Sequence, residues 1–81
     1  MDNIKDDRYY TDKMLVDLLF IQAKMTGQSF EDFSNNDLLQ DSMMFRLIQI
    51  SENARKLTDS FRREQANIPW SDVFEIGRAH V

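Results

Sequence analysis

Four basic side chains that lie close together in the sequence are the residues best suited to contact phosphate. Residues 55–63 contain one acid, Asp59, and four cations, Arg55, Lys56, Arg62 and Arg63, which give this stretch a net charge of +3. Lysine and arginine are the usual partners of nucleic-acid phosphates. The alternative is that these residues form only a solvated face of helical turns. We treat the four cations as candidate RNA or phosphate contacts.

A second polar group consists of Arg46, Glu52 and Asn53, which lie on a long helix that the sequence predicts around them. These side chains could form a polar patch at an active face or at the seam of a dimer. The alternative is a structural pair, either buried or at the surface.

The sequence offers no metal or cofactor site. The acidic pairs Asp6-Asp7 and Glu31-Asp32 have no histidine or cysteine companions, which transition-metal sites commonly include. Both glycines stand alone, so no glycine-rich loop is present to cradle a phosphate. We therefore expect neither a metal nor a cofactor.

Two amphipathic helices must position the polar groups. Apolar residues recur at helical spacing over residues 6–25, at Met14, Leu18, Ile21 and Met25, with a flanking row of Leu15, Leu19 and Gln22. The same spacing predicts the longest helix over residues 37–57, through Leu39, Met43, Leu47, Ile50, Ala54 and Leu57. We expect these two helices to pack antiparallel, with Leu47 and Ile50 deeply buried.

A short turn is expected to join the two helices. Thr26-Gly27 supplies the glycine that commonly follows the end of a helix. Ser29, followed three places later by Asp32, has the pattern of a capping box and predicts one helical turn. That turn carries Phe30 and Phe33, which we expect to cover the core.

Two shorter elements are predicted after the long helix. Residues 58–60 should end or kink that helix, and a short segment follows over residues 61–65. Pro69 holds Ile68 extended and suits the first position of another helix. We expect Phe61, Trp70 and Phe74 to close one end of the bundle.

Length and composition restrict the class of protein. Eighty-one residues with two glycines and one proline suit a single all-α domain better than a many-stranded sheet. The net charge of -4 argues against a protein that binds nucleic acid through one large basic face. The chain has no cysteine, no apolar run of about 20 residues and no apolar signal core, so we expect a cytoplasmic protein without a membrane contact.

Four segments together carry a family resemblance. They are Tyr9-Tyr10, Leu38-Leu39-Gln40-Asp41, the run over residues 46–57 and, most specifically, Ile68-Pro69-Trp70-Ser71-Asp72-Val73-Phe74. In register over residues 6–74, they resemble the HepT-like family of the HEPN superfamily. The resemblance implies an up-and-down helical bundle that forms a homodimer and acts as a metal-independent ribonuclease toxin. It also implies a partner, a minimal nucleotidyltransferase that serves as the antitoxin.

The resemblance further implies where catalytic residues belong. In the family an arginine, about four intervening residues and then a histidine follow the Ile-Pro-Trp helix. The histidine moves the proton of a ribose hydroxyl, and the arginine stabilises phosphoryl oxygens. Here the only histidine, His80, comes two positions after Arg78. Two such positions on a helix differ by about 200°, so the pair cannot converge on one phosphate. We expect no catalytic residue in this chain and place the missing motif just after Phe74.

The C-terminal residues have a separate explanation. Ile76-Gly77-Arg78-Ala79-His80-Val81 followed by a stop codon is what a common sequencing adapter encodes in one reading frame. A glycine at position 77 also argues against a helix that continues there. We predict that residues 1–74 are the N-terminal part of a HepT-like domain, C-terminally truncated, and that residues 75–81 are a non-native tail. The alternative is a natural, divergent terminus.

Two functions of different class remain. The chain is either a fragment of a HepT-like ribonuclease toxin, with RNA as the substrate of the full-length protein only, or a catalytically inactive helical module for dimerisation or interaction. An arginine and a histidine downstream of Phe74 would favour the enzyme, and their absence the module.

Overall fold

The structure is a computed structural model that describes residues 5–79 and the side chains of residues 5–76. The described chain forms five helices, α1 (Asp7–Met25), α2 (Phe30–Ser34), α3 (Asp37–Arg55), α4 (Asp59–Glu64) and α5 (Trp70–Ala79). Within these residues there is no strand. The predicted all-α fold is therefore confirmed.

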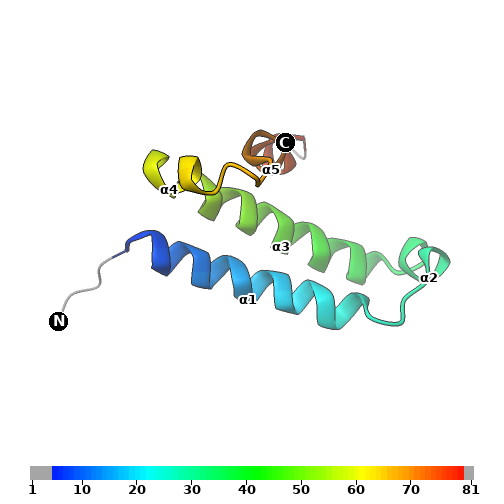
Figure 1. Cartoon of the computed structure of the whole chain (residues 1–81). Coiled ribbons are helices and arrows are strands. Elements are labelled where there is room, and N and C mark those ends of the chain that lie inside the picture. Colours follow the sequence, from blue (N-terminus) through cyan, green and yellow to red (C-terminus); the bar gives the residue numbers. More distant parts are fainter. Residues whose placement is uncertain (1–4, 80–81) are drawn as a thin grey trace.

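The longest helices, α1 and α3, lie side by side and antiparallel, and α2 connects them at one end (Figure 1). Helix α3 also packs against α5, so it is the central helix of the arrangement. Among the residues whose side chains the structure describes, the buried apolar ones belong to α3 or follow it closely: Met43, Ile50, Ala54 and Leu57. No helix in the described part of the chain combines the length and the apolar character needed to cross a membrane.

The predicted turn between the long helices is confirmed. Gly27 has a φ of 81°, a conformation that glycine adopts without a steric penalty. Ser29 and Asp32 form a complete capping box at the start of α2. The Asn36 side chain then caps α3 by accepting a hydrogen bond from the Leu39 backbone N–H at 2.9 Å.

One expectation for this turn is wrong. Phe30 does not cover the core, since 86% of its surface is exposed, whereas Phe33 is half-buried. Helix α2 contains only five residues and begins at Phe30. Such a short helix turns one of its two rings toward α3 and leaves the other in solvent.

The two residues expected to be deeply buried differ. Ile50 has only 6% of its surface exposed, but Leu47 is only half-buried, so the prediction for Leu47 is wrong. Leu47 lies one helical turn before Ser51, on the side of α3 where α5 crosses. The crossing is centred nearer Ser51 and Arg55, both of which hydrogen-bond to α5. Leu47 therefore remains partly uncovered.

A hydrogen-bonded tie connects the end of α3 to the start of α1. Helix α3 ends at Arg55, two residues before the predicted boundary, and Thr58 caps α4 through a bond from the Phe61 N–H. The Thr58 N–H and hydroxyl both donate to the Asp7 carboxylate, at 2.8 and 2.7 Å. One carboxylate thus fixes the place where the chain leaves the long helices.

Helix α5 is longer than the sequence predicts. It begins one residue after Pro69, whose carbonyl accepts a hydrogen bond from the Val73 N–H, and its backbone continues through Gly77 to Ala79. The expectation that the helix stops before this glycine is wrong for the backbone. One glycine costs a helix only about 1 kcal/mol, and the first turns of α5 are anchored on α3.

Candidate functional site

The four cations that the sequence predicts as phosphate contacts lie around the junction of α3, α4 and α5. Arg55 donates from Nη2 to the Phe74 carbonyl at 2.7 Å, and the Ser51 hydroxyl donates to the same carbonyl at 3.3 Å. The guanidinium carbons of Arg55 and Arg62 each lie 5.3 Å from the centroid of the Phe74 ring. These contacts attach α5 to the end of α3 through a single residue.

Arg62 is used mainly to hold the junction together. Its Nη1 donates to the carbonyls of Ala54 and Leu57, at 3.3 and 2.8 Å, and its Nη2 pairs with the Asp59 carboxylate. These carbonyls lie at the C-terminal end of α3, where a cation is favourable for the helix dipole. Only 22% of the Arg62 side chain is exposed. A phosphate would have to share this guanidinium with the fold.

The other three cations are exposed but point to different places. Arg63 lines a shallow depression of about 360 Å³ beside Arg62 and Trp70. Lys56 lies over the ring of Tyr10, 5.7 Å from its centroid, while Arg55 faces Phe74. The structure therefore spreads the four predicted contacts around the junction, and they do not converge on one point.

Trp70 fixes the connection between α4 and α5. Its Nε1–H is shared between the carbonyls of Arg62 and Gln65, at 3.2 and 3.1 Å. Trp70, Phe61 and Phe74 are all half-buried, as expected for rings that close this end of the bundle. The Ile-Pro-Trp segment thus sets the direction of α5, and with it the position of the residues that follow Phe74.

The polar group predicted on the long helix is divided by the structure. Arg46 forms an ion pair with Asp17 of α1, with 2.8 Å between Nη1 and Oδ1, and its guanidinium carbon lies 3.9 Å from the Phe20 ring centroid. Asn53 is buried, whereas Glu52 is exposed. A single patch of Arg46, Glu52 and Asn53 is thus not formed.

Asp17 is a buried polar residue that sequence reasoning missed. Its side chain is only 3% exposed, and its partner Arg46 is 26% exposed. The sequence does contain a signal that this acid is buried, because Asp17 lies within an apolar stripe, three places after Met14 and four before Ile21. An acid at such a position requires a cation on the facing helix.

The remaining candidate pair cannot be placed. The side chain of Arg78 and the whole of His80 lie outside the described residues, so their inability to act together stays a prediction from sequence. In the part of the chain that the structure describes, no three histidine, cysteine, aspartate or glutamate side chains are grouped to bind a metal.

Two known proteins are similar in sequence to this chain. One, from Caldanaerobacter subterraneus subsp. tengcongensis, is named "Putative RNase" and is 29% identical over 70 residues, which cover 86% of this chain and 62% of that protein. The other, from Methanocaldococcus jannaschii, is named "Gamma-glutamylcyclotransferase and putative RNase" and is 28% identical over 72 residues, which cover 89% of this chain and 32% of that protein. No family model and no solved structure matches. Both relatives are named for ribonuclease.

Proposed function

We propose that this chain is the N-terminal part of a HepT-like, metal-independent ribonuclease. The observation that carries the proposal is the similarity of nearly the whole chain to two proteins that are both named for ribonuclease. The all-α architecture and the Ile-Pro-Trp segment, which orients α5, agree with the family resemblance. In this proposal the catalytic arginine and histidine follow Phe74 in the natural gene.

The junction supports a role for the segment after Phe74. Because Arg55 and Ser51 fix the Phe74 carbonyl, the chain leaves this point in a defined direction from a rigid support. Catalytic groups work best when such a support restricts their position. In the proposed reaction the histidine removes the proton of a ribose 2′-hydroxyl, and the freed oxygen attacks the neighbouring phosphorus to form a 2′,3′-cyclic phosphate. The bond to the 5′-oxygen breaks, and the protonated histidine returns its proton to that oxygen, which leaves as a hydroxyl. The arginine stabilises the charge on the phosphoryl oxygens.

The proposal includes the assembly and the tail. The natural protein forms a homodimer, and a minimal nucleotidyltransferase encoded beside it is the antitoxin. Residues 75–81 are the adapter-derived tail, so the chain as written lacks the catalytic pair and does not cleave RNA. Genomic sequence beyond codon 74 tests the proposal of an adapter-derived tail directly. A natural gene that encodes Ile-Gly-Arg-Ala-His-Val and then a stop would contradict it.

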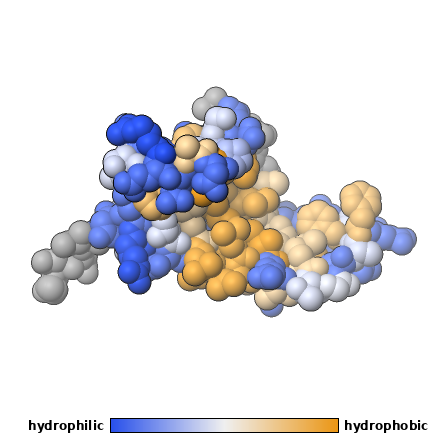
Figure 2. All heavy atoms as spheres, viewed as in Figure 1, coloured by the Kyte–Doolittle hydropathy of each residue, from blue (hydrophilic) through white to orange (hydrophobic). Residues whose placement is uncertain are grey.

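The second candidate is a catalytically inactive helical module for dimerisation or interaction. It is favoured by exposed leucines on α1, where Leu15, Leu18 and Leu19 have 52%, 50% and 53% of their surfaces exposed. Figure 2 shows an apolar area over the middle of α1 and α3. Large exposed apolar areas mark interaction surfaces.

An RNA cleavage assay separates the two candidates. The gene is restored by adding the genomic codons that follow Phe74, and the product is incubated with RNA in excess EDTA. The enzyme proposal predicts cleavage that is insensitive to EDTA and is lost when the recovered histidine is changed to alanine. Cleavage that requires a divalent metal contradicts the mechanism, and a recovered sequence without arginine and histidine favours the module.

A further inference from the structure

Each aromatic side chain of α1 has a cation over its ring. Lys13 lies over Tyr9 and Lys24 over Phe20, both 5.6 Å from the ring centroid, and both pairs are four residues apart on one helix. Two cations come from the facing helix α3: Arg46 lies 3.9 Å from the Phe20 centroid and Lys56 lies 5.7 Å from that of Tyr10.

These pairs are connected along the surface. The rings of Tyr9 and Tyr10 meet edge to face, with their centroids 5.0 Å apart. Lys13 and Arg46 line one hollow of about 180 Å³, together with Val16, Asp17 and Gln49. We call the resulting surface the cation–aromatic row; in order, it consists of Lys56, Tyr10, Tyr9, Lys13, Arg46, Phe20 and Lys24.

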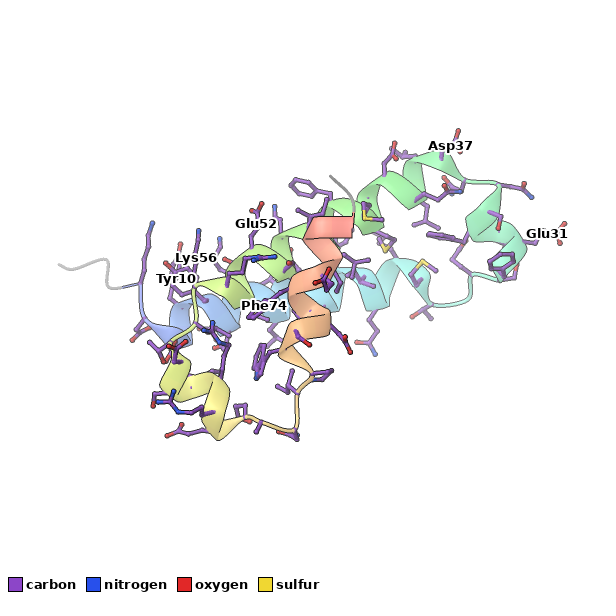
Figure 3. The ribbon with its side chains drawn as sticks, turned by 90° about the horizontal axis from the view of Figure 1, so that it is seen from above. Tyr10, Glu31, Asp37, Glu52, Lys56 and Phe74 are labelled. Atoms are coloured by element: carbon purple, nitrogen blue, oxygen red, sulfur yellow. The ribbon has the colours of Figure 1, made fainter. Side chains whose placement is uncertain are left out.

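The row concentrates available positive charge in an acidic protein. It contains four of the ten basic residues of a chain whose net charge is -4, and three of them, Lys13, Lys24 and Lys56, supply the available charge. The carboxylate of Asp17 is buried and already paired with Arg46. Among the described residues, no carboxylate forms an ion pair with Lys13, Lys24 or Lys56. Glu52 is exposed on α3 one turn before Lys56, and both side chains point away from Phe74 (Figure 3).

Cations alternating with aromatic rings fit a single-stranded nucleic acid. Lysine and arginine contact the phosphates, and bases stack on the rings without a strict sequence preference. Tyr9 and Lys24 are fifteen positions apart on α1, which is about 22 Å of helix and long enough for several nucleotides. Lys56 is next to Arg55 in the sequence, so the row ends at the C-terminal end of α3, beside the α3–α4–α5 junction and on the side that faces away from Phe74.

We propose that the cation–aromatic row binds single-stranded RNA and leads the strand to the junction where α5 begins. This inference rests on the proposed function for the identity of the ligand. The row, and not the dispersed cations of the junction, is then the main RNA-binding surface of the described chain.

A binding measurement tests the row on the 81-residue protein itself. The probe is a fluorescein-labelled oligouridine of about 12 nucleotides, a length within the range that single-strand binding surfaces cover, and the readout is fluorescence anisotropy. The test variant is Lys13→Gln/Lys24→Gln. The control is Arg8→Gln, which also removes an exposed cation from α1 but lies outside the row.

The row makes quantitative predictions for these proteins. The double variant should bind about tenfold or more weakly, and its dependence of log affinity on log salt should fall by about 1.4, or 0.7 for each lost phosphate contact. Arg8→Gln should stay within about twofold of the unmodified protein, because a single surface charge acts weakly through solvent. Tyr9→Leu, which keeps an apolar side chain but removes the ring, should weaken binding about fivefold or more through lost stacking. Far-UV circular dichroism checks that each variant keeps its helix content.

The outcomes separate this inference from the proposed function. Three results would each overturn the proposal that the row binds RNA. The unmodified chain could fail to bind RNA, the double variant could bind as tightly as the unmodified chain, or Arg8→Gln could lose as much affinity as the double variant. If the restored protein cleaves RNA while the row variants leave binding unchanged, the ribonuclease proposal stands and the inference fails. If the row binds RNA but the restored protein does not cleave it, the inference about the row stands and the ribonuclease proposal fails.

Discussion

The two faces of the α1–α3 pair differ in how their apolar side chains are covered. On one face, lysine and arginine side chains cover the rings of Tyr9, Tyr10 and Phe20, and Arg46 pairs with the buried Asp17. On the other face, Leu15, Leu18 and Leu19 are each about half exposed. We call these three leucines the apolar face. Long charged side chains of the chain itself lie over the rings of the first face, whereas among the described residues no comparable layer lies over the leucines of the apolar face.

The difference shows that one helix can have its apolar side chains covered by the same chain on one flank and left exposed to solvent on the other. Long cationic side chains cover apolar surface with their stems and keep the charge in water, so the cation–aromatic row is stable when solvated. Leucines cannot do this, and their exposure calls for another protein surface. In the proposed function, that surface belongs to the bundle helices after Phe74 or to the second subunit.

The largest loss of stability is expected at the seam between the two faces. Ile50→Ala should lower the free energy of unfolding by about 3–4 kcal/mol, because Ile50 is buried and a cavity would remain. Leu47→Ala should cost only about 1–2 kcal/mol, because Leu47 is half-buried and removes less apolar area from water. Urea unfolding of both variants measures the difference. Equal losses in the free energy of unfolding would contradict the partial exposure of Leu47.

The next effect concerns the charged pair. Arg46→Ala should lower the free energy of unfolding by about 3 kcal/mol, because the Asp17 carboxylate would be left buried without a partner. The double variant Asp17→Leu/Arg46→Met should recover most of this loss, since apolar replacement of a buried pair is often neutral. Thermal and urea unfolding of both proteins test this expectation. A double variant that is no more stable than Arg46→Ala would argue against a burial penalty as the cause.

The apolar face should affect association more than folding. The 81-residue chain is expected to self-associate or to be poorly soluble, and Leu15→Gln/Leu19→Gln should reduce its mean mass in light scattering. Val16→Gln is the matched control, because Val16 is 61% exposed on the same helix but lines the hollow beside Lys13 and Arg46. The restored chain is expected to be a discrete dimer. Equal masses for the unmodified chain, the leucine variant and the control would contradict a role for the apolar face.

The smallest effect on stability is expected at Phe30 in α2, which the sequence predicts to cover the core but which is exposed. Phe30→Ser should change the free energy of unfolding by less than about 0.5 kcal/mol, because the ring lies in solvent. A loss of about 2 kcal/mol in urea unfolding would return Phe30 to the core, where the sequence alone had placed it.

The local features of the fold were predictable, because they depend on neighbours in the chain. The Ser29–Asp32 capping box and the glycine after α1 are each decided within a few residues. The half-buried state of Leu47 and the pairing of Asp17 depend instead on where α5 and α3 lie, and no local pattern contains that information.

The candidate site was predicted by residue type but not by arrangement. Arg55, Lys56, Arg62 and Arg63 do lie around one junction, yet Arg62 is largely used to cap α3. The cation–aromatic row was not anticipated, because it combines residues of α1 with Arg46 and Lys56, which only the antiparallel packing brings to the same face. The catalytic groups expected after Phe74 remain a prediction from the family resemblance.

The most direct test of the central claim is RNA cleavage in EDTA, measured side by side for the 81-residue chain and for the chain restored with its genomic codons after Phe74. We expect the restored chain to cleave RNA and the 81-residue chain to leave it intact. An inactive restored chain that retains the recovered arginine and histidine contradicts the ribonuclease proposal. Cleavage by the 81-residue chain that is lost in His80→Ala contradicts the claim that the active histidine lies outside this sequence.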